Sequence, residues 1–592
     1  MSQKIINTDD LAFLLYEMLD IERFTQFPRY EDHSRDTFDA AIELALKVAS
    51  ETFAPHNRLC DEDEPRFENG KVVIRPEVSE ALAVLRDTGL MAASQDYERG
   101  GMQLPAAVAQ TCIGLIKGAN VSTQAYAGLT IAACNLIMAH GTDEQKQRYA
   151  EPMMAGRFFG TMCLTEPHAG SSLGDIKSRA IPQDDGTYRI SGNKIFISAG
   201  DHELSENIVH LVLAKLPDAP PGAKGISLFI VPKFLVDDEG NPTERNGVSL
   251  AGLIHKLGYR GTTSTALSFG DDAPCHGYLV GEPHQGLKYM FQMMNEARVG
   301  VGFGAAVIGY RGYMHSLEYA KDRLQGRKAS EKNPESPQVP IIDHADVRRM
   351  LLAQKAYSEG GLALCLYGAR LMDDQHTHPD EQKRQEAGKL LDLLTPVIKA
   401  WPSEYGPKAN DLAIQVYGGA GYTREYPVEQ CWRDNRLNPI HEGTNGIQAL
   451  DLLGRKIWQD QSHGLQLLMQ EMQVDLQAAT TDRCQQWALS LSETLQQAVK
   501  VTQSLGKSLM EGDPDKTLAN ASCYLHLFGH IIVAWMWLRQ ANAAAHALGS
   551  ANTDDERNFY QGKLQAAQYF FHWELPTVAQ DLVLLRNQDD TC

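Results

Sequence analysis

Apolar residues that recur every three or four positions predict helices in the first third of the chain. In the segment 34–55 one helical face carries five apolar side chains, Phe38, Ile42, Ala45, Ala49 and Phe53. We expect Pro55 to end this helix, because proline breaks the hydrogen bonding of a helix interior. Thr142 and Gln145 have the spacing of a capping box, which predicts another helix start.

The pattern changes to strands between about Phe159 and Gly281. Three segments there are short, rich in β-branched or aromatic residues and bounded by Gly, Pro, Asp or Asn: Tyr188–Ser198, Asn207–Leu216 and Gly225–Val236. Strands that follow one another without helices between them favour a compact antiparallel barrel or sandwich.

Helical periodicity returns at about residue 286 and continues to the end of the chain. The polar, proline-rich stretch Ala329–Pro340 predicts an exposed loop, and Asp513–Asn520 predicts a turn followed by a helix start. The fold class is therefore α+β, with a helical domain, a β domain, a second helical domain and an added helical unit. We place the divisions at 1–37 (N-terminal extension), 38–158, 159–281, 282–456 and 457–592.

The most apolar later stretch, Leu525–Leu538, is expected to be a buried helix of a bundle. It is too short to span a bilayer, and it carries His526 and His530. The N-terminal stretch MSQKIINTDDLAFLLYEML has no basic segment followed by an apolar run, so we expect no secretory signal. These features predict a soluble cytoplasmic protein without stable membrane insertion.

Composition narrows the possible functions. A chain of 592 residues is expected to contain several domains. Its formal net charge of -20 disfavours nucleic acids and anionic membranes as partners. From Lys456 onward nine Lys and Arg stand against fifteen Asp and Glu. The ten cysteines lie more than four residues apart, so local spacing predicts no metal site, and the thiols suggest a reducing compartment.

Glu442 is the residue for which the sequence allows two different roles. It lies in the turn HEGTNG, directly before an amphipathic helix pattern. A glutamate near a helix N-terminus is favoured by the helix dipole, and a carboxylate held on a turn could also be a catalytic base. The stretch RVGVGFGAA, residues 298–306, follows no strand, so we interpret its small residues as helix packing and not as a dinucleotide-binding loop.

Six separated motifs together resemble one family, the acyl-CoA dehydrogenase flavoproteins. The motifs are MCLTEPHAGSSLGD, KIFISAGD, NEARVGVGFGAAVIG, AKDRLQGRK, QVYGGAGYTREYPVEQCWRDNRLNPIHEGTNGIQ and the strand-rich middle. The resemblance covers about Phe38 to Lys456, and the long ends resemble the bacterial branch that includes fatty acyl-CoA and 3-methylmercaptopropionyl-CoA dehydrogenases. It implies the acyl-CoA dehydrogenase fold, with FAD held between a β-barrel and a helical bundle and across a homodimer contact.

The resemblance also implies a reaction and a set of site residues. The reaction is α,β-dehydrogenation of an acyl-CoA thioester to a trans-2-enoyl-CoA, with Glu442 as the base. Substrate contacts fall on Arg298, Ser171, His441 and Gly443. Cofactor contacts fall on Leu164, Thr165, Ser171, Phe196, Ser198, Arg323, Gln415, Gly418, Gly419 and Thr444.

Three positions depart from the family pattern or compete with it. Some relatives carry the base on the helix that bears the conserved arginine, and that position is Ala297 here, with Glu296 beside it. Ser172 stands where Asp is common, and His441 stands where Tyr is common. A histidine beside the base could alter the pKa of the base, narrow the acyl pocket or only line it.

The family resemblance leaves several functions open. An acyl-CoA dehydrogenase of fatty acid β-oxidation would pass electrons to an electron-transferring flavoprotein. A 3-methylmercaptopropionyl-CoA dehydrogenase, an acyl-CoA oxidase that uses O2 and a nucleic-acid-associated flavoprotein of the same fold are alternatives. The acidic C-terminal unit argues against the last. Short relatives form tetramers, and we expect the added unit to cover the face used there and leave a homodimer.

Overall fold

Residues 5–591 are described by a computed structural model, except for the side chains of residues 292–295, and they form two units. The first unit consists of residues 36–297. The second unit combines residues 5–35 with residues 298–591. The N-terminal stretch that we predicted to be a separate extension therefore belongs, from residue 5 to 35, to the unit that holds the C-terminal half of the chain; residues 1–4 lie outside the described residues.

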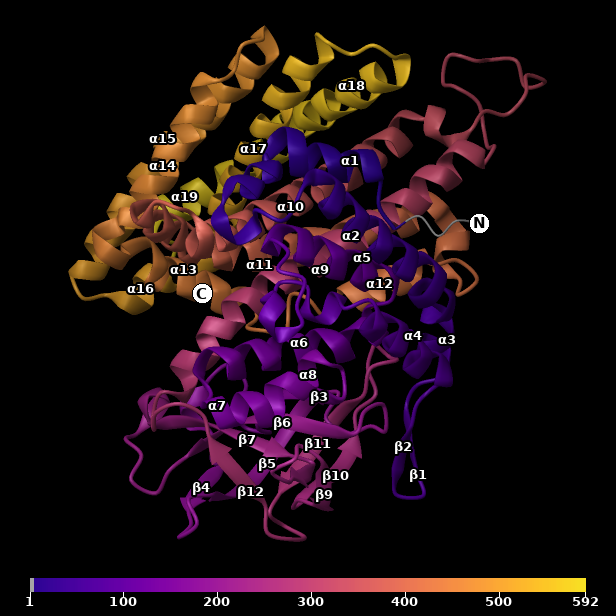
Figure 1. Ribbon diagram of the computed structural model, residues 1–592. Helices are drawn as coiled ribbons and strands as arrows, with labels where there is room; N and C mark the ends of the chain where they lie inside the picture. Colours follow the sequence, from indigo (N-terminus) through magenta and orange to yellow (C-terminus); the bar gives the residue numbers. More distant parts are fainter. Residues whose placement is uncertain (1–4, 592) are drawn as a thin grey trace. The chain divides into compact units, whose positions relative to one another are not determined.

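The first unit contains helices and the β domain (Figure 1). Its helices are α2 (Arg35–Val48), α3 (Asn57–Glu62), α4 (Pro76–Asp87), α5 (Ala106–Ala119), α6 (Val121–His140), α7 (Asp143–Gln145) and α8 (Glu151–Met154). Its strands are β1 (Arg66–Glu68), β2 (Lys71–Val73), β3 (Phe158–Cys163), β4 (Arg179–Pro182), β5 (Tyr188–Ser198), β6 (Asn207–Lys215), β7 (Ile226–Pro232), β8 (Phe234–Val236), β9 (Pro242–Arg245), β10 (Val248–Leu253), β11 (Ser264–Phe269) and β12 (His276–Leu279).

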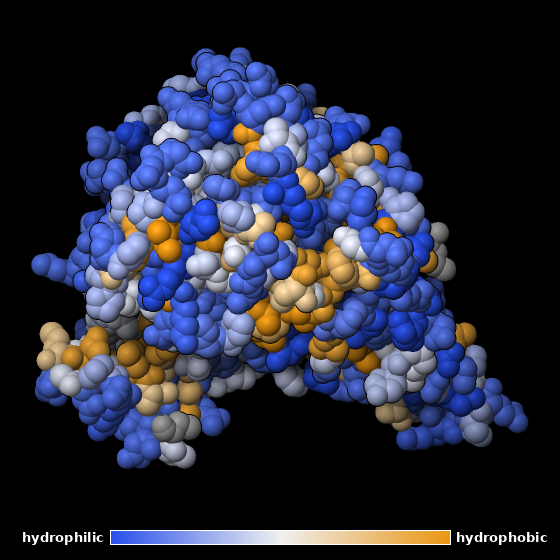
Figure 2. All heavy atoms as spheres, turned by 90° about the horizontal axis from the view of Figure 1, so that it is seen from below, coloured by the Kyte–Doolittle hydropathy of each residue, from blue (hydrophilic) through white to orange (hydrophobic). Residues whose placement is uncertain are grey.

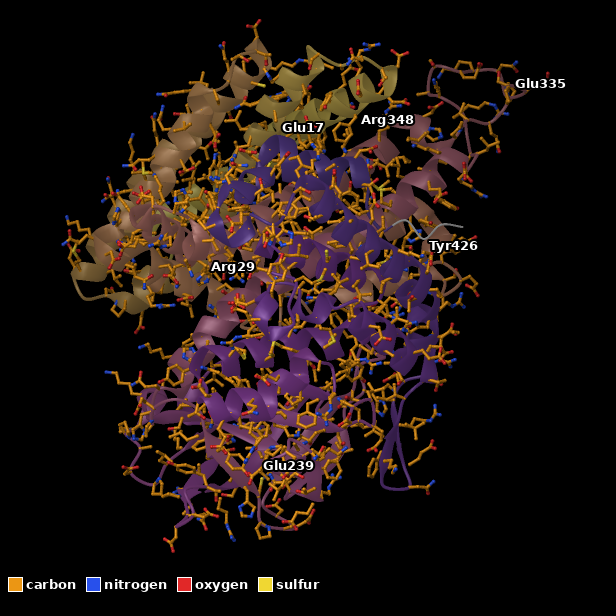
Figure 3. The ribbon with its side chains drawn as sticks, viewed as in Figure 1. Glu17, Arg29, Glu239, Glu335, Arg348 and Tyr426 are labelled. Atoms are coloured by element: carbon orange, nitrogen blue, oxygen red, sulfur yellow. The ribbon has the colours of Figure 1, made fainter. Side chains whose placement is uncertain are left out.

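The second unit is helical. Its helices are α1 (Thr8–Ala12), most of α9 (Gly286–Asp322), α10 (Ala345–Thr377), α11 (Glu381–Tyr417), α12 (Val428–Asn435), α13 (Asn445–Gly454), α14 (His463–Gln477), α15 (Asp482–Met510), α16 (Pro514–Leu518), α17 (Ala521–Leu548), α18 (Asp554–Tyr569) and α19 (Ala579–Asn587). The loop predicted at Ala329–Pro340 lies between α9 and α10, and Glu335 marks its projecting part (Figure 3).

The predicted helical face of α2 is confirmed, but the predicted helix end is wrong. The five apolar residues, three in α2 and two in the π-helical segment Ala49–Phe53 that continues it, are at most 9% exposed. Pro55 occupies an early position of a 3-10 turn, Ala54–His56, and α3 begins directly afterwards at Asn57. Proline is tolerated there because the first residues of a helical turn need no N–H donor. The capping box of Thr142 and Gln145 is confirmed.

Five strands close a ring in the β domain. The pairs run β4–β5, β5–β12, β12–β7, β7–β6 and β6–β4, so β4 joins the two ends. The predicted barrel is therefore confirmed, although β6 pairs in parallel with both β3 and β4. The first two predicted strands match β5 and β6 within one residue. The third is divided at Lys233 into β7 and β8. Helices α6 and α8 pack on β3 (Figure 1).

Helix α17 is longer than the apolar segment that predicted it. It extends over 28 residues, which makes it, among the described residues, the one helix long and apolar enough to cross a membrane. The prediction that this segment is too short to do so is therefore wrong. The prediction of a buried helix is confirmed, because 78% of its apolar window is buried. Trp535 and Trp537 are fully buried, and Trp537 Nε1 donates to the carbonyl of Ala356 on α10 at 3.1 Å.

A glycine makes this close packing between α10 and α17 possible. A Cβ added at Gly360 would lie 2.7 Å from Trp537 Nε1 and 2.9 Å from Val533 Cγ1. Helices α10, α11, α13, α14, α15, α18 and α19 all contact α17. The added C-terminal unit, residues 457–592, therefore buries its central helix against α10, α11 and α13 of the preceding helical domain as well as against its own helices.

Candidate functional site

Two strand ends in the β domain bring four of the predicted cofactor residues together. Leu164 and Thr165 directly follow β3, while Phe196 and Ser198 end β5. The backbone N–H of Ile195 donates to the carbonyl of Thr165 at 3.0 Å, so the two segments lie side by side.

A buried ion pair holds these two segments together. Lys194 Nζ lies 2.9 Å from Glu166 Oε1 and also donates to the carbonyl of Leu164 at 3.0 Å. Burial alone would raise the pKa of Glu166, but the ammonium group of Lys194 and hydrogen bonds from Lys177 and Ser178 lower it to about 2. Sequence analysis did not single out this pair, although Glu166 follows Thr165 and Lys194 lies two residues before Phe196.

Phe196 lies in a conformation that matches a ligand-facing role. Its φ of 59° is in the left-handed region, which is costly for an aromatic residue and is most often seen at functional sites. The residue is 62% exposed. The β5–β11 register shifts at this point, so a bulge turns the residue out of the ladder. An exposed ring beside Thr165 and Ser198 fits the planar, polar ring system of a flavin.

Ser171 and Ser172 lie on an exposed turn of the same unit. An isolated antiparallel β-bridge pairs Glu166 with Ala169, just before these two serines. Because Glu166 is fixed by Lys194, this turn is anchored to the same ion pair as the strand ends.

In the second unit, Glu442 lies at the tip of a strained turn. The φ values are 53° at Glu442 and 84° at Gly443, and a side chain in this region costs energy unless the surroundings enforce it. The N–H of Asn445 closes the turn on the carbonyl of Pro439 at 3.0 Å. The buried amide of Gln448 donates to the carbonyls of Glu442 and Gly443, each at 3.3 Å. These contacts therefore hold Glu442 in a backbone conformation that a glutamate does not favour by itself.

Gly443 is required by both its φ and its surroundings. A Cβ added there would lie 2.7 Å from Gln448 Nε2 and 3.8 Å from Arg298 Nη2. Thr444 caps α13 by accepting the N–H of Ile447 at 3.2 Å. His441 Nε2 lies 3.0 Å from Asn438 Oδ1, so its ring is held against the chain that enters the turn.

Arg298 is buried. It therefore does not form a solvent-exposed salt bridge on the helix surface, which is a common role for an arginine on a helix. It is 4% exposed, and its Nη1 lies 3.5 Å from Asp451 Oδ2 on α13. Burial lowers the pKa of Arg298, whereas the carboxylates of Asp451 and Glu442 raise it. Arg298 thus places a positive charge behind the Glu442 turn and attaches α9 to α13.

Glu296, the alternative candidate for the base, is hydrogen-bonded within the first unit. Asn135 Nδ2 donates to Glu296 Oε2 at 3.3 Å, and burial raises the pKa of Glu296. The structure therefore assigns Glu296 to a contact with α6.

The remaining predicted cofactor residues lie on exposed surface of the second unit. Gln415, Gly418 and Gly419 lie at or just beyond the end of α11, and a Cβ added at either glycine would meet no atom within 4 Å. Arg323 lies at the neck of the loop that contains Glu335, where its carbonyl accepts the N–H of Ile341 at 2.8 Å. Its side chain is exposed and donates to Gln325 at 3.3 Å.

Sequence analysis missed one charged residue beside the Glu442 turn, Lys399 on α11. It is fully buried, and its Nζ donates to Asn445 Oδ1 at 3.3 Å. The only signal in the sequence is a lysine among apolar residues of a helix, which by itself does not indicate a site.

Comparison with known proteins identifies the family to which the chain belongs. Four family profiles match in chain order: acyl-CoA dehydrogenase N-terminal domain at 36–157, middle domain at 161–271, C-terminal domain at 284–458, and acetyl-CoA dehydrogenase C-terminal like at 468–592. The chain belongs to the acyl-CoA dehydrogenase family. Acyl-CoA dehydrogenases are FAD-dependent oxidoreductases that introduce an α,β double bond into acyl-CoA thioesters, and this chain is one of them.

Similar proteins cover nearly the whole chain. The 3-methylmercaptopropionyl-CoA dehydrogenase of Ruegeria pomeroyi is 37% identical over 93% of this chain and 94% of its own length. The broad-specificity linear acyl-CoA dehydrogenase FadE5 of Mycobacterium tuberculosis is 35% identical over 100% of this chain and 98% of its own. An acyl-CoA dehydrogenase from Bacillus anthracis, solved with FAD, shares the fold with a TM-score of 0.75 at 20% identity, over 96% of this chain and 91% of that one. These matches confirm the predicted family and fold.

Proposed function

We propose that this acyl-CoA dehydrogenase acts in fatty acid β-oxidation, uses Glu442 as its base and passes electrons to an electron-transferring flavoprotein. The observation that supports this most is the enforced turn at Glu442, whose carboxylate is near enough to the buried Arg298 to raise the pKa of that arginine against the effect of burial. A strained, over-determined conformation is typical of a residue whose position matters for chemistry.

The chain's own groups supply the proton-transfer half of the reaction. An α-proton of a thioester is weakly acidic, so a positioned carboxylate must accept it as the bond to carbon breaks. Glu442 would accept that proton. Gln448 and Arg298 would keep the turn from relaxing, because they fix its carbonyls and the helix behind it. Bound FAD would supply acceptance of the β-hydrogen as hydride.

The cofactor residues of the first unit fit a flavin ring. Leu164, Thr165, Phe196 and Ser198 would hold it, and the Lys194–Glu166 ion pair keeps their segments in register. Gln415, Gly418, Gly419 and Thr444 would hold the adenosine side, and Arg323 the diphosphate of the partner subunit's FAD. Gly443, His441, Arg298 and Ser171 would contact the acyl-CoA substrate.

A substrate screen tests the proposed activity. We expect anaerobic addition of straight-chain acyl-CoAs, from short to long, to bleach the flavin absorbance of the purified protein. Bleaching by 3-methylmercaptopropionyl-CoA alone would assign the activity of the Ruegeria pomeroyi relative instead. Reduced enzyme that reoxidises rapidly in air would favour an oxidase, and no bleaching by any thioester would contradict the proposal. A gel shift at low salt tests the nucleic-acid alternative.

We also propose a homodimer that shares its FAD sites. Arg323, Gly418 and Gly419 are exposed in one chain, as residues that serve a neighbouring subunit must be. Arg323→Ala is expected to lower FAD retention and dimer stability together, because a ligand bound across an interface stabilises that interface. Light scattering and flavin content measure both. A monomer with full flavin content would contradict the shared site, and a wild-type mass near four chains would contradict the covering role of the C-terminal unit.

We further propose a cytoplasmic protein without stable membrane insertion, divided into parts at residues 37, 158, 281 and 456. The four family matches support these divisions. Burial of α17 and the net charge of -20 oppose insertion and attraction to an anionic bilayer. On the face drawn in Figure 2 hydrophilic residues predominate, while apolar residues gather in a band near the centre and at the lower left.

A further inference from the structure

Lys399 is a buried cation that packs directly against the turn of the base. It lies on α11 with a fully buried side chain, and its Nζ donates to Asn445 Oδ1 at 3.3 Å. Within residues 5–591 no described carboxylate lies within 4.0 Å of this Nζ. A buried ammonium group that faces only an amide is costly, so it calls for a nearby negative charge that compensates it.

Asn445 connects Lys399 to the conformation of the turn. Its backbone N–H closes the turn on Pro439, while its Nδ2 lies 3.5 Å from the carbonyl of Ala400 and 3.4 Å from Glu404 Oε2. The end of the Glu442 turn is therefore attached to α11 by the side chain of Asn445, to which Lys399 donates a hydrogen bond.

We propose that Lys399 is a positioning residue of the catalytic base: through Asn445 it fixes the Glu442 turn to α11, and its ammonium group supplies the positive charge that keeps Glu442 ionised for proton abstraction. This inference rests on the proposed role of Glu442. It adds a second cation on another helix to Arg298, which approaches the turn from α9.

The charges around Lys399 agree with this role. Burial lowers the pKa of Lys399 to about 7, the Glu442 carboxylate opposes that shift and Arg298 adds to it. Glu404, on α11 itself, contacts Asn445. Below pH 7 Lys399 is thus protonated, and its positive charge favours the ionised form of the nearby Glu442 carboxylate.

The test is the pH dependence of flavin reduction in Lys399→Met. The change removes the charge and keeps an unbranched side chain of similar length. The acid limb of the rate is expected to move to higher pH by about 1 to 3 units, the usual effect of losing one close opposite charge. Above about pH 8, where Lys399 is neutral in the wild type as well, only the loss of the hydrogen bond to Asn445 should remain, so the two rates should differ there by a small, constant factor. Lys399→Arg keeps a charge and is expected to restore the acid limb.

Two further variants separate charge from attachment. Asn445→Ala keeps the ammonium group and should lower the rate without moving the acid limb. Lys383→Met, which removes an exposed lysine of the same helix paired with Glu386, should match the wild type at every pH. If Lys399→Met does not fold, Lys399→Gln is compared in the same way.

A rate lowered equally at all pH values in the Lys399 variant would overturn the inference, since that is the effect of a merely structural residue. The outcome is distinguishable from failure of the proposed function. If Glu442→Gln reduces flavin normally, the assignment of the base fails. If Glu442→Gln is inactive while the Lys399 variant keeps the wild-type acid limb, only the inference about Lys399 fails.

Discussion

Glu442→Gln is expected to slow reduction of bound flavin by acyl-CoA by about 10²- to 10⁴-fold, the usual contribution of a general base. The amide has nearly the shape of the carboxylate but cannot accept the α-proton. The turn should persist in the variant, because its carbonyls are held by Gln448 and its end by Asn445, neither of which needs the carboxylate. Anaerobic stopped-flow absorbance measures the rate directly.

Retention of the sites distinguishes lost chemistry from lost structure. The variant should keep its flavin and still bind acyl-CoA, since neither depends on the charge of Glu442. Glu296→Gln is the matched control, because it removes a carboxylate that pairs with Asn135 and should reduce flavin at nearly the wild-type rate. The reverse pattern, with fast bleaching in the Glu442 variant and slow bleaching in the Glu296 variant, would move the base to α9.

Local signals in the sequence predicted much of the geometry of the proposed site, because the residues that form its turn are close together along the chain. The segment around Glu442 contains the carboxylate, the glycine that accepts a positive φ and the threonine that caps the next helix. The ends of β5 and β6 were predictable for a similar reason, since β-branched or aromatic residues form these strands and turn-forming residues bound them. Periodicity also located the buried face of α2.

Contacts between distant segments could not be predicted. Lys399 and Asn445 lie 46 positions apart, and their contact depends on how α11 packs on α13. The barrel closes through β4, a strand of four residues whose pattern is too short to identify. Pro55 was misassigned because the rule for helix interiors does not apply to the first positions of a 3-10 turn. In each case the deciding factor is tertiary geometry.

The longest-range example is a buried charge cluster in the second unit. Lys563 on α18 contacts Asp10 on α1 and lies 2.8 Å from Glu359 on α10, and all three residues are at most 1% exposed. Lys355 pairs with Glu359 as well, and Tyr310 donates to Asp10 at 2.9 Å. One lysine of the C-terminal unit thus connects the N-terminal segment to the bundle. Near this cluster, Tyr560 of α18 donates to Glu17 at 3.1 Å, and Glu17 is labelled in Figure 3.

Lys563→Met is therefore expected to lower the free energy of unfolding by about 3 to 5 kcal/mol, the cost of leaving a buried charge without its partner. Two carboxylates would remain in the cluster with only Lys355 to balance them. The midpoint of urea unfolding, followed by circular dichroism, measures the loss. Lys500→Met, which removes an exposed lysine of α15, is the matched control and should change stability by no more than about 0.5 kcal/mol.

The pH dependence and a double variant identify charge as the cause. Burial and the charge of Glu359 already raise the pKa of Asp10, and Lys563 opposes this, so its removal raises that pKa further. A carboxyl group whose pKa is higher in the folded state than in the unfolded state binds more protons when folded, and stability then falls as pH rises through the folded pKa. The loss should therefore be smaller at acidic than at alkaline pH. The double variant Lys563→Met, Asp10→Asn again has a balanced charge in the cluster, because Lys355 then faces Glu359 alone. It should recover part of the lost stability. Equal losses at all pH values and additive effects of the two changes would show that Lys563 stabilises the fold by packing and not by charge.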